Sequence, residues 1–306
     1  MTILFGPVPS RRLGLSLGVD LIPPKTCTFD CLYCQVGRTT RKTAEPKIFV
    51  PTREVLEALR LRLDKVRPDF VTFSGSGEPT LHAQIDQAIA FVKERGDVQT
   101  AVLTNGSLFW RPEVRERVLQ ADTVMPTLST VFEKTFEIIH RPHPDLRLPD
   151  ILEGLRRLRL EYSGQLWVEV VLLAGLNDTE EEIEALSAEM ERIAPDKIQL
   201  NTVVRPPSDS RALPLDRKRM EDIKNYFGAK AEIIAHAEGF RKERVHGPLS
   251  VAILEMARRR PVTAVDISKA LNRSLEDVES TVKGLVIKGH LRSQEHMGDT
   301  YYSHKG

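Results

Sequence analysis

Cysteine, long hydrophobic runs and net charge are all scarce in this sequence of 306 residues. No run approaches the roughly 18 apolar residues of a membrane-spanning helix, and the N-terminus lacks the charged and apolar regions of a signal peptide. We therefore expect a cytoplasmic protein with no membrane partner. The formal net charge of +1 gives the molecule no overall field that would attract nucleic acid. At 34.6 kDa the chain is long enough for one large core and an appended domain.

The three cysteines, Cys27, Cys31 and Cys34, fall within eight residues in the spacing C-x3-C-x2-C. A structural disulfide is disfavoured, because an odd number leaves one thiol over and a low cysteine content fits a reducing compartment. Three thiolates suit a soft metal or an iron–sulfur cluster, and a four-iron cluster held by three cysteines keeps one iron open for another ligand. Zinc is the alternative, but it needs a fourth ligand, and the nearest histidine in the sequence is His82.

This spacing, with Tyr33 directly before the last cysteine, resembles the signature of the radical S-adenosylmethionine (radical SAM) superfamily. The resemblance implies that Cys27, Cys31 and Cys34 hold a [4Fe-4S] cluster whose free iron binds S-adenosylmethionine (SAM). It also implies that the reduced cluster cleaves SAM to a 5′-deoxyadenosyl radical, which takes a hydrogen atom from a substrate, so that the cofactor carries the difficult chemistry. Tyr33 would pack near the adenine. The implied electron donor is a low-potential flavodoxin or ferredoxin.

Residues 15–235 alternate short apolar runs with segments of helical period, the pattern of β/α units around a parallel sheet. The predicted strands are 15–22, 70–73, 100–103, a short one around 124–125, 166–173 and 197–204. Six units are too few to close an eight-stranded barrel. They match the open (β/α)6 arc, a partial TIM-like barrel of the α/β class, that the radical SAM resemblance implies. Functional side chains should then gather at the carboxyl ends of the strands.

The segment Ser74-Gly75-Ser76-Gly77-Glu78-Pro79 follows the second predicted strand. It resembles the superfamily's glycine–glycine–glutamate element, which holds the amino group of SAM, although Ser76-Gly77 stands where two glycines are usual. Glycine lets the backbone approach a ligand closely, and the Glu78 carboxylate would be a charge-assisted partner for an ammonium group. We expect Ser74, Gly75, Ser76, Gly77 and Glu78 to bind SAM. An ordinary strand-to-helix connection is the alternative.

Polar residues at the other strand ends are further candidates for SAM contacts. Asn105 ends the third strand and Ser129 follows the fourth, both placed to reach a ribose hydroxyl or the methionine carboxylate. Glu169 lies in an apolar segment, where an acid without a partner costs several kcal/mol. It should pair with a ribose diol or a basic side chain, unless that face of the strand is open to solvent. The remaining adenine or substrate candidates are Asn177, Gln199 and Asn201.

Basic residues on the loop side of the arc are candidates for binding a phosphate or carboxylate of the substrate. They are Arg11, Arg12, Arg141, His143 and Arg205. The alternative is that they are solvated loop residues. His140 and His143 share one loop and would suit a second metal site, although the neighbouring prolines favour a stiff turn.

The stretch from Phe5 through the cysteines, opening FGPVPSRRLG, resembles one branch of the superfamily. That branch groups uncharacterised iron–sulfur oxidoreductases with the wyosine-forming enzymes of tRNA, and the resemblance covers roughly residues 5–235. The tRNA enzymes use a second cysteine set for an additional cluster, whereas this chain has no cysteine left. The shortage argues against sulfur chemistry on an auxiliary cluster and against two-cysteine methylation. One-cluster reactions remain, such as rearrangement, cleavage, epimerisation or dehydrogenation after hydrogen abstraction.

The C-terminal part has the pattern of a separate unit. We expect a radical SAM domain over 1–236, a linker over 237–249 and a small domain over 250–306. Three helical segments and an alternating stretch over 290–303 resemble a winged helix-turn-helix with its β-wing. From Arg241 on, 12 Lys and Arg stand against 8 Asp and Glu. The last helix nevertheless begins with acidic Glu276 and Asp277, which repel phosphate, so we favour a module that docks substrate, RNA, peptide or protein over a DNA reader.

Two functions of different class follow from these patterns. The first is a radical SAM enzyme of oxidoreductase or transferase type whose C-terminal unit presents or recognises the substrate. The second is a regulator that senses redox state with an iron–sulfur cluster and binds an operator with a winged helix. The Ser76-Gly77-Glu78 segment and the polar strand ends favour the enzyme, because a sensor needs only the cysteines.

Overall fold

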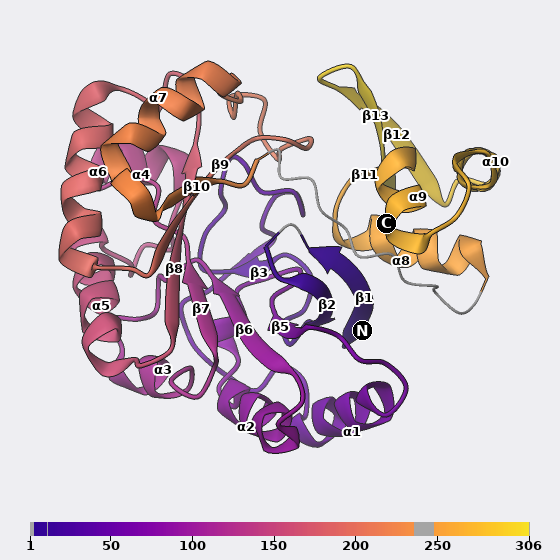
Figure 1. Ribbon diagram of the computed structural model, residues 1–306, viewed down its shortest axis with the longest axis horizontal. Coiled ribbons are helices and arrows are strands. Elements are labelled where there is room, and N and C mark those ends of the chain that lie inside the picture. Colours follow the sequence, from indigo (N-terminus) through magenta and orange to yellow (C-terminus); the bar gives the residue numbers. More distant parts are fainter. Residues whose placement is uncertain (1–2, 11, 236–247, 306) are drawn as a thin grey trace.

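The computed structural model describes residues 3–10, 12–235 and 248–305. Its main sheet has eight strands in the order β1-β2-β5-β6-β7-β8-β9-β10, and every neighbouring pair except β1–β2 is parallel. The strands are β1 (Leu4–Ser10), β2 (Gly14–Val19), β5 (Phe70–Phe73), β6 (Gln99–Thr104), β7 (Thr123–Pro126), β8 (Gln165–Leu172), β9 (Lys197–Thr202) and β10 (Ala231–Ile233). Figure 1 shows the sheet curving into an open arc, which confirms the partial-barrel prediction.

The six strands predicted from the sequence are present, and the two edge strands β1 and β10 are additional. Strand β1 carries Pro7 and Pro9, and proline marks a strand as an edge or a non-strand because it cannot donate to a ladder. It pairs only with β2, as an antiparallel hairpin. Strand β10 is three residues long, too short for alternation to be read from the sequence.

Helices cover the outer face of the arc (Figure 1). They are α1 (Thr52–Leu63), α2 (Ile85–Arg95), α3 (Pro112–Glu116), α4 (Glu133–His140), α5 (Leu148–Glu161), α6 (Glu180–Ile193) and α7 (Arg217–Phe227). On β8, Leu166, Val168 and Val170 belong to the main core with residues of these helices. Because side chains alternate along a strand, Trp167 and Glu169 of β8 point to the opposite, concave face. The concave face is therefore where polar side chains can meet a ligand.

The C-terminal residues form a second unit with its own apolar core around Ile253, Val262, Ile267 and Val282. Its elements are α8 (Leu249–Arg259), β11 (Val262–Thr263), α9 (Ala264–Leu271), α10 (Leu275–Ile287), β12 (Leu291–His296) and β13 (Asp299–His304). The three strands form one sheet in the order β11-β13-β12. This order of elements is the one that a winged helix-turn-helix requires, and the assignment to that class stays a prediction.

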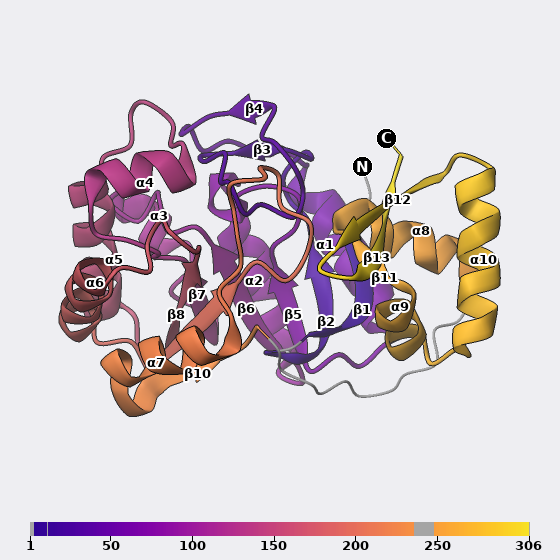
Figure 2. The ribbon, with the colours of Figure 1, turned by 90° about the horizontal axis from the view of Figure 1, so that it is seen from above.

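The C-terminal unit lies beside the β1–β2 edge of the arc, as both ribbon views show (Figures 1 and 2). Most of the predicted linker, residues 237–247, falls outside the described residues, and α8 begins at Leu249. In the described part of the chain, no helix combines the length and the apolar character that crossing a membrane requires.

Candidate active site

The loop that carries the cysteines follows β2 and is pinned at its base by two short strands. Strand β3 (Thr26–Cys27) pairs in parallel with β4 (Arg41–Lys42). All three cysteines are free and partly buried. Burial raises the pKa of Cys27 to about 12, and it also raises the pKa of Cys31 and Cys34, with the neighbouring cysteines adding to the effect at Cys27 and Cys31. Metal coordination deprotonates such thiols outright, so the donor set fits an iron–sulfur cluster.

His140, the last residue of α4, lies directly under this loop. Its Nδ1 is 3.4 Å from Cys31 Sγ and 3.4 Å from the Tyr33 hydroxyl, and the two rings meet edge to face at 5.8 Å. Its carbonyl accepts a hydrogen bond from the Asp30 N–H. Burial lowers the pKa of His140 to about 3, so the imidazole is neutral. His143, a candidate for a second metal site together with His140, instead pairs with Asp145 at 3.5 Å.

Replacing His140 by leucine is expected to loosen the loop without removing a cysteine. Side chains that orient metal ligands from outside the coordination shell typically change metal affinity or activity ~10–100-fold when replaced. The measurement is the iron retained by the reconstituted protein under a fixed chelator challenge. His290→Leu, at an exposed position of the C-terminal unit, is the matched control. Equal iron retention in both variants would contradict the assigned role of His140.

The turn over Ser74–Pro79 is joined to the base of the cysteine loop by backbone hydrogen bonds. The Lys25 N–H donates to the Ser76 carbonyl at 2.7 Å, and the Glu78 N–H donates to the Thr26 carbonyl at 3.2 Å. Gly75 has a φ of +131°, and a Cβ at Gly77 would lie 2.2 Å from the Thr26 carbonyl oxygen. The positive φ at residue 75 favours glycine, and the close approach at residue 77 leaves no room for a side chain. The turn and the loop are therefore hydrogen-bonded together at close range.

Glu78 is buried beneath this turn, 2% exposed. Its Oε1 accepts hydrogen bonds from the Thr80 N–H, the Thr80 hydroxyl and the Thr104 hydroxyl, at 3.0, 2.7 and 2.6 Å, and its Oε2 accepts one from the Asn105 N–H at 2.8 Å. Burial raises the pKa of Glu78 above its usual value, although the hydrogen bonds from these donors act to lower it. The carboxylate thus holds the turn to the end of β6. Its predicted role as partner of the SAM ammonium group stays a prediction.

The Glu78→Gln variant is expected to be less stable, because an amide N–H₂ replaces an acceptor in a cluster of four donors. An unsatisfied buried polar group costs ~1–3 kcal/mol, which should appear as a lower midpoint of thermal unfolding. Glu45→Gln, at a side chain that is 73% exposed, is the matched control. A midpoint unchanged in Glu78→Gln would show that this hydrogen-bond cluster is unimportant for the fold.

Asn105 lies beside Cys27. Its Nδ2 donates to the Thr28 hydroxyl at 2.6 Å and approaches Cys27 Sγ at 3.6 Å, while its Oδ1 accepts from the Ser107 N–H. The sequence prediction placed Asn105 in contact with SAM. The structure puts it where the end of β6 meets the first cysteine, within the same site.

Glu169 has the basic partner that its apolar surroundings required. Arg12 Nη1 lies 3.4 Å from Glu169 Oε2, and Asn201 Nδ2 donates to Glu169 Oε1 at 2.8 Å. The Arg12 and Glu169 side chains are each 17% exposed, so the alternative of a solvent-facing strand does not hold. Three residues predicted separately therefore meet on the concave face. Gln199 is directed elsewhere, toward Glu232 of β10.

Ser129 and Asn177 are fully buried and bonded to backbone. The Ser129 hydroxyl accepts from the Val171 N–H at 3.1 Å, and Asn177 Nδ2 donates to the Ser129 and Val171 carbonyls at 2.7 and 2.9 Å. Asn177 Oδ1 accepts from the Leu173 N–H at 2.7 Å. These contacts hold the end of β8 in place. A direct SAM contact by either residue stays a prediction.

The predicted basic substrate residues are dispersed. Arg11 lies outside the described residues. Arg141 pairs with Asp30 at 3.4 Å and with Asp209, near the cysteine loop. Arg205, 7% exposed, pairs at 3.2 Å with Asp266 of α9 and so connects the arc to the C-terminal unit. Among the members of this set that the structure describes, only Arg12 lines the large cavity described below.

Two residues that the sequence analysis did not single out connect the turn to the C-terminal unit. Asp20, just after β2, accepts hydrogen bonds from the Ser76 N–H and hydroxyl at 3.2 and 2.7 Å. Arg259 of α8 lies 3.0 Å from the same carboxylate oxygen and 3.9 Å from the centroid of the Phe5 ring. Burial raises the pKa of Asp20, whereas the hydrogen bonds from Ser76 and the positive charge of Arg259 lower it. No local pattern relates residues so far apart in sequence.

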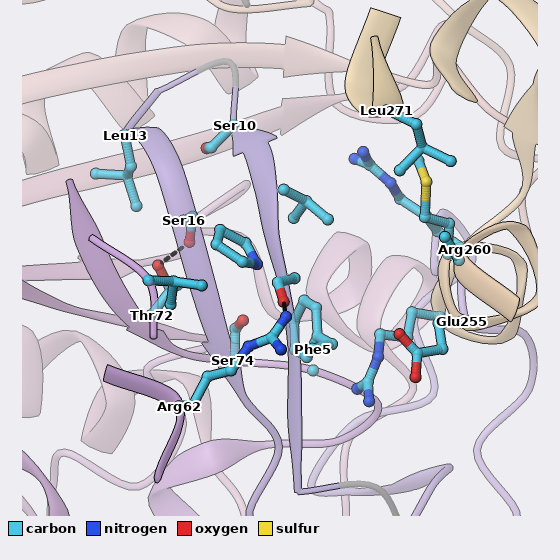
Figure 3. A pocket seen from close by; sticks show the side chains of 18 of the residues that line it. Phe5, Ser10, Leu13, Ser16, Arg62, Thr72, Ser74, Glu255, Arg260 and Leu271 are labelled. Atoms are coloured by element: carbon cyan, nitrogen blue, oxygen red, sulfur yellow. Dashed lines mark hydrogen bonds between the residues drawn. The ribbon is translucent and has the colours of Figure 1, made fainter. Parts of the chain in front are cut away.

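A cavity of about 730 Å³ opens between the arc and the C-terminal unit. The arc contributes residues of β1, the β1–β2 connection, β2, α1 and the turn, including Phe5, Arg12, Arg62 and Ser74, and α8 with Leu271 of α9 contributes the opposite wall. Figure 3 shows Ser16, Thr72 and Ser74 on one side and Glu255, Arg260 and Leu271 on the other. The cavity therefore reaches the predicted SAM-binding turn and is bordered on one side by the C-terminal unit.

Comparison with known proteins gives concordant matches. Residues 21–188 match the family described as the Radical SAM superfamily. A UPF0026 protein of Methanocaldococcus jannaschii is 35% identical over 311 residues, 99% of this chain and 96% of the relative. A Brachyspira hyodysenteriae protein named GTPase Obg is 34% identical over 295 residues, 95% of this chain but 43% of the relative, so this chain spans less than half of that protein. A solved structure of TYW1 with a lysine-pyruvate adduct bound shares the fold, with a TM-score of 0.51 and 17% identity over 71% of this chain and 74% of that chain.

Proposed function

Because this chain belongs to the radical SAM superfamily, and within it to the UPF0026 family, we propose that it cleaves SAM reductively and abstracts hydrogen from a substrate held between its arc and its C-terminal unit. Enzymes of this superfamily bind a [4Fe-4S] cluster and SAM, and generally need a reductant such as flavodoxin or ferredoxin. The alternative of a redox-sensing regulator has no support among the matched proteins. The exact reaction belongs to the one-cluster group, since the chain has three cysteines.

The observation that carries the proposal is the pair of backbone hydrogen bonds that connects the cysteine loop to the Ser74–Pro79 turn. Cys27, Cys31 and Cys34 would hold the cluster, which when bound supplies the electron for cleaving SAM. The turn, 2.7 Å from the loop at its Ser76 carbonyl, would orient the methionine end of SAM beside it. Preorganised positioning of this kind is the main contribution of a protein to cofactor chemistry. Asn105 would fix the position of Cys27 relative to the turn, because it contacts both Cys27 and Glu78.

The concave face would position the rest of SAM and the reacting part of the substrate. Arg12, Glu169 and Asn201 form a network there that can bind hydroxyl groups. Tyr33, with its ring against His140, would border the adenine. The C-terminal unit would exclude water from the cavity, which protects a reactive radical from side reactions. Docking of an RNA, peptide or protein on the outer surface of that unit is a further part of the proposal.

The test is anaerobic reconstitution with iron and sulfide, followed by SAM and dithionite. The expected result is about four iron atoms per chain, as a [4Fe-4S] cluster requires, and 5′-deoxyadenosine formed only when both SAM and reductant are present. Protein that purifies with one zinc atom, or whose reduced cluster leaves SAM intact, would overturn the proposal. Boiled protein and protein without reductant are the controls.

A further inference from the structure

The sulfurs of Cys31 and Cys27 each lie within hydrogen-bond range of a side-chain nitrogen. Nδ1 of His140 is 3.4 Å from Cys31 Sγ, and Nδ2 of Asn105 is 3.6 Å from Cys27 Sγ. Sulfur is larger than oxygen, so these separations suit an N–H···S hydrogen bond. The nitrogens come from different parts of the arc, since His140 ends α4 and Asn105 follows β6. The fold therefore supplies a candidate donor to each of these two cysteines.

The direction of both hydrogen bonds follows from the chemistry of the coordinated cysteines. A cysteine that binds a metal is a thiolate, which accepts hydrogen bonds and has no hydrogen to donate. The Asn105 amide nitrogen carries two hydrogens, of which one goes to the Thr28 hydroxyl at 2.6 Å and the other is left for Cys27. The His140 imidazole reaches Cys31 through Nδ1, so the tautomer with a hydrogen on Nδ1 is the one that donates.

The position of His140 relative to Cys31 is fixed by backbone hydrogen bonds on both sides of the cysteine. The Asp30 N–H donates to the His140 carbonyl, and the Leu32 N–H donates to the Ile139 carbonyl, both at 2.9 Å. The two residues that flank Cys31 are thus bonded to the last turn of α4. The His140 side chain belongs to a residue that is 3% exposed. Its contact with the Cys31 sulfur is therefore part of the packed structure.

A hydrogen bond to a cysteine sulfur of a cluster affects how readily the cluster accepts an electron. The reduced cluster carries one more negative charge than the oxidised cluster, and hydrogen bonds to charged acceptors are the stronger ones. Donors to the sulfurs therefore stabilise the reduced form more than the oxidised form, which raises the reduction potential. Burial alone acts in the opposite direction, because a charge is less stable away from water.

We propose that His140 and Asn105 raise the reduction potential of the cluster by donating hydrogen bonds to the thiolates of Cys31 and Cys27. The inference deepens the proposed function and rests on its cluster, which takes one electron from the flavodoxin or ferredoxin reductant. No covalent bond forms or breaks in this step. Loss of one donor should lower the equilibrium constant of the reduction on the order of 10-fold, which is about 59 mV for one electron.

The experiment measures the midpoint potential of the reconstituted full-length protein without SAM. Dithionite is the reductant, and electron paramagnetic resonance follows the reduced cluster. His140→Phe removes the donor and keeps a ring beside Phe29 and Phe136, whose centroids lie 5.1 and 5.3 Å from the imidazole. Its potential should fall by about 59 mV, and Asn105→Leu should lower the potential as well. A midpoint potential does not depend on the fraction of protein that holds a cluster, so loss of iron alone does not produce the shift.

Two variants separate donation to sulfur from a general loosening of the loop. In His140→Asn the side-chain amide supplies an N–H near the position of Nδ1, so the potential should stay close to that of the unaltered protein. Ser208→Ala removes hydrogen bonds to the carbonyls of Cys31 and Leu32 and leaves the donor to the sulfur in place. Its potential should be unchanged.

Tyr33 is the other side chain with a polar hydrogen at this position, because its hydroxyl lies 3.4 Å from His140 Nδ1. Tyr33→Phe should change the potential less than His140→Phe does. A fall in Tyr33→Phe with no fall in His140→Phe would overturn the assignment to His140.

Unchanged potentials in His140→Phe and Asn105→Leu would overturn the inference, as would a potential in His140→Asn as low as that in His140→Phe. Cleavage of SAM is assayed separately on the same preparations. Shifted potentials with SAM left intact would refute the proposed function and leave this inference standing, because the inference requires only a cluster that takes up an electron. Cleavage of SAM with unshifted potentials would refute this inference alone.

Discussion

Cys31→Ala is expected to lose the cluster and to reduce the formation of 5′-deoxyadenosine to background. Cys31 is the middle of the three cysteines and the one in contact with His140. The chain has no other cysteine to replace it, and a cluster left with two protein thiolates would have two irons without a protein ligand. Iron and acid-labile sulfide content, together with the electronic absorption of the reconstituted protein, measure the loss directly.

Ser208→Ala is the matched comparison for Cys31→Ala. The Ser208 hydroxyl donates to the carbonyls of Cys31 and Leu32 at 2.8 and 3.0 Å, so its removal disturbs the same loop without removing a thiol. A neutral hydrogen bond contributes ~0.5–1.5 kcal/mol, and iron content should stay near that of the unaltered protein. If Cys31→Ala retained iron and activity as Ser208→Ala does, the three cysteines would not be the ligands of the cluster.

Arg259→Met is expected to destabilise the protein and to weaken its affinity for SAM. The change leaves the Asp20 carboxylate, 3% exposed, without its cation. In the described part of the chain its Oδ1 already has no hydrogen-bond partner. Breaking a buried ion pair by removing one member costs ~3–5 kcal/mol. Since Asp20 also binds Ser76 through both its N–H and its hydroxyl, the turn proposed to hold SAM should shift with it.

The effect of Arg259→Met should depend on pH in a defined direction. Burial raises the pKa of Asp20 above its ordinary value, and the charge of Arg259 opposes the rise. Without Arg259 the pKa in the folded protein rises further, while in the unfolded chain it stays near its ordinary value. The folded variant then binds more protons than the folded parent between the two folded pKa values, so the loss of stability grows as pH rises through that window. Urea denaturation at pH 5 and pH 7 measures it.

Three comparisons separate the role of Arg259 from a general loss of stability. Arg258→Met, at the exposed neighbouring position of α8, should change neither stability nor SAM binding. The double variant Arg259→Met with Asp20→Asn should be less unstable than the sum of the single variants, because contacting residues are coupled. At a temperature where all variants are folded, the KM for SAM should rise more than kcat falls. A fall in stability with an unchanged KM would show that the contact between units does not reach the turn.

The arc could be predicted from the sequence because its signals are local. Phe70–Phe73 and Gln165–Leu172 are strongly β-forming runs followed by polar turns, and parallel strands buried on both faces read as such runs. Strand β1 could not be predicted, since its two prolines argue against a strand and its hairpin partner alone makes it one. Helix α4 has eight residues, too few for a clear helical period.

The residues of the candidate site also fall into two groups: those that a short sequence pattern reveals and those that only the fold brings together. The cysteine spacing and the glycine positions of the turn are properties of a few adjacent residues, so a short pattern reveals them. Glu169 was expected to have a basic partner because it is an acid among apolar residues, but nothing in the sequence says that the partner is Arg12. His140 beside Cys31, and Asp20 between Ser76 and Arg259, join segments about 110 and 240 residues apart in the chain.

The amino-acid sequence by itself determined the superfamily, the class of fold and the cofactors, because each depends on spacing within a short segment or on periodicity within one element. Only the tertiary structure decided which side chains meet, which polar side chains at the strand ends are already hydrogen-bonded to the backbone, and that α8 borders a cavity beside the turn. The physical reason is that hydrogen bonds and ion pairs act over a few ångströms. Whether two residues come that close is set by how the sheet curves and where the second unit packs.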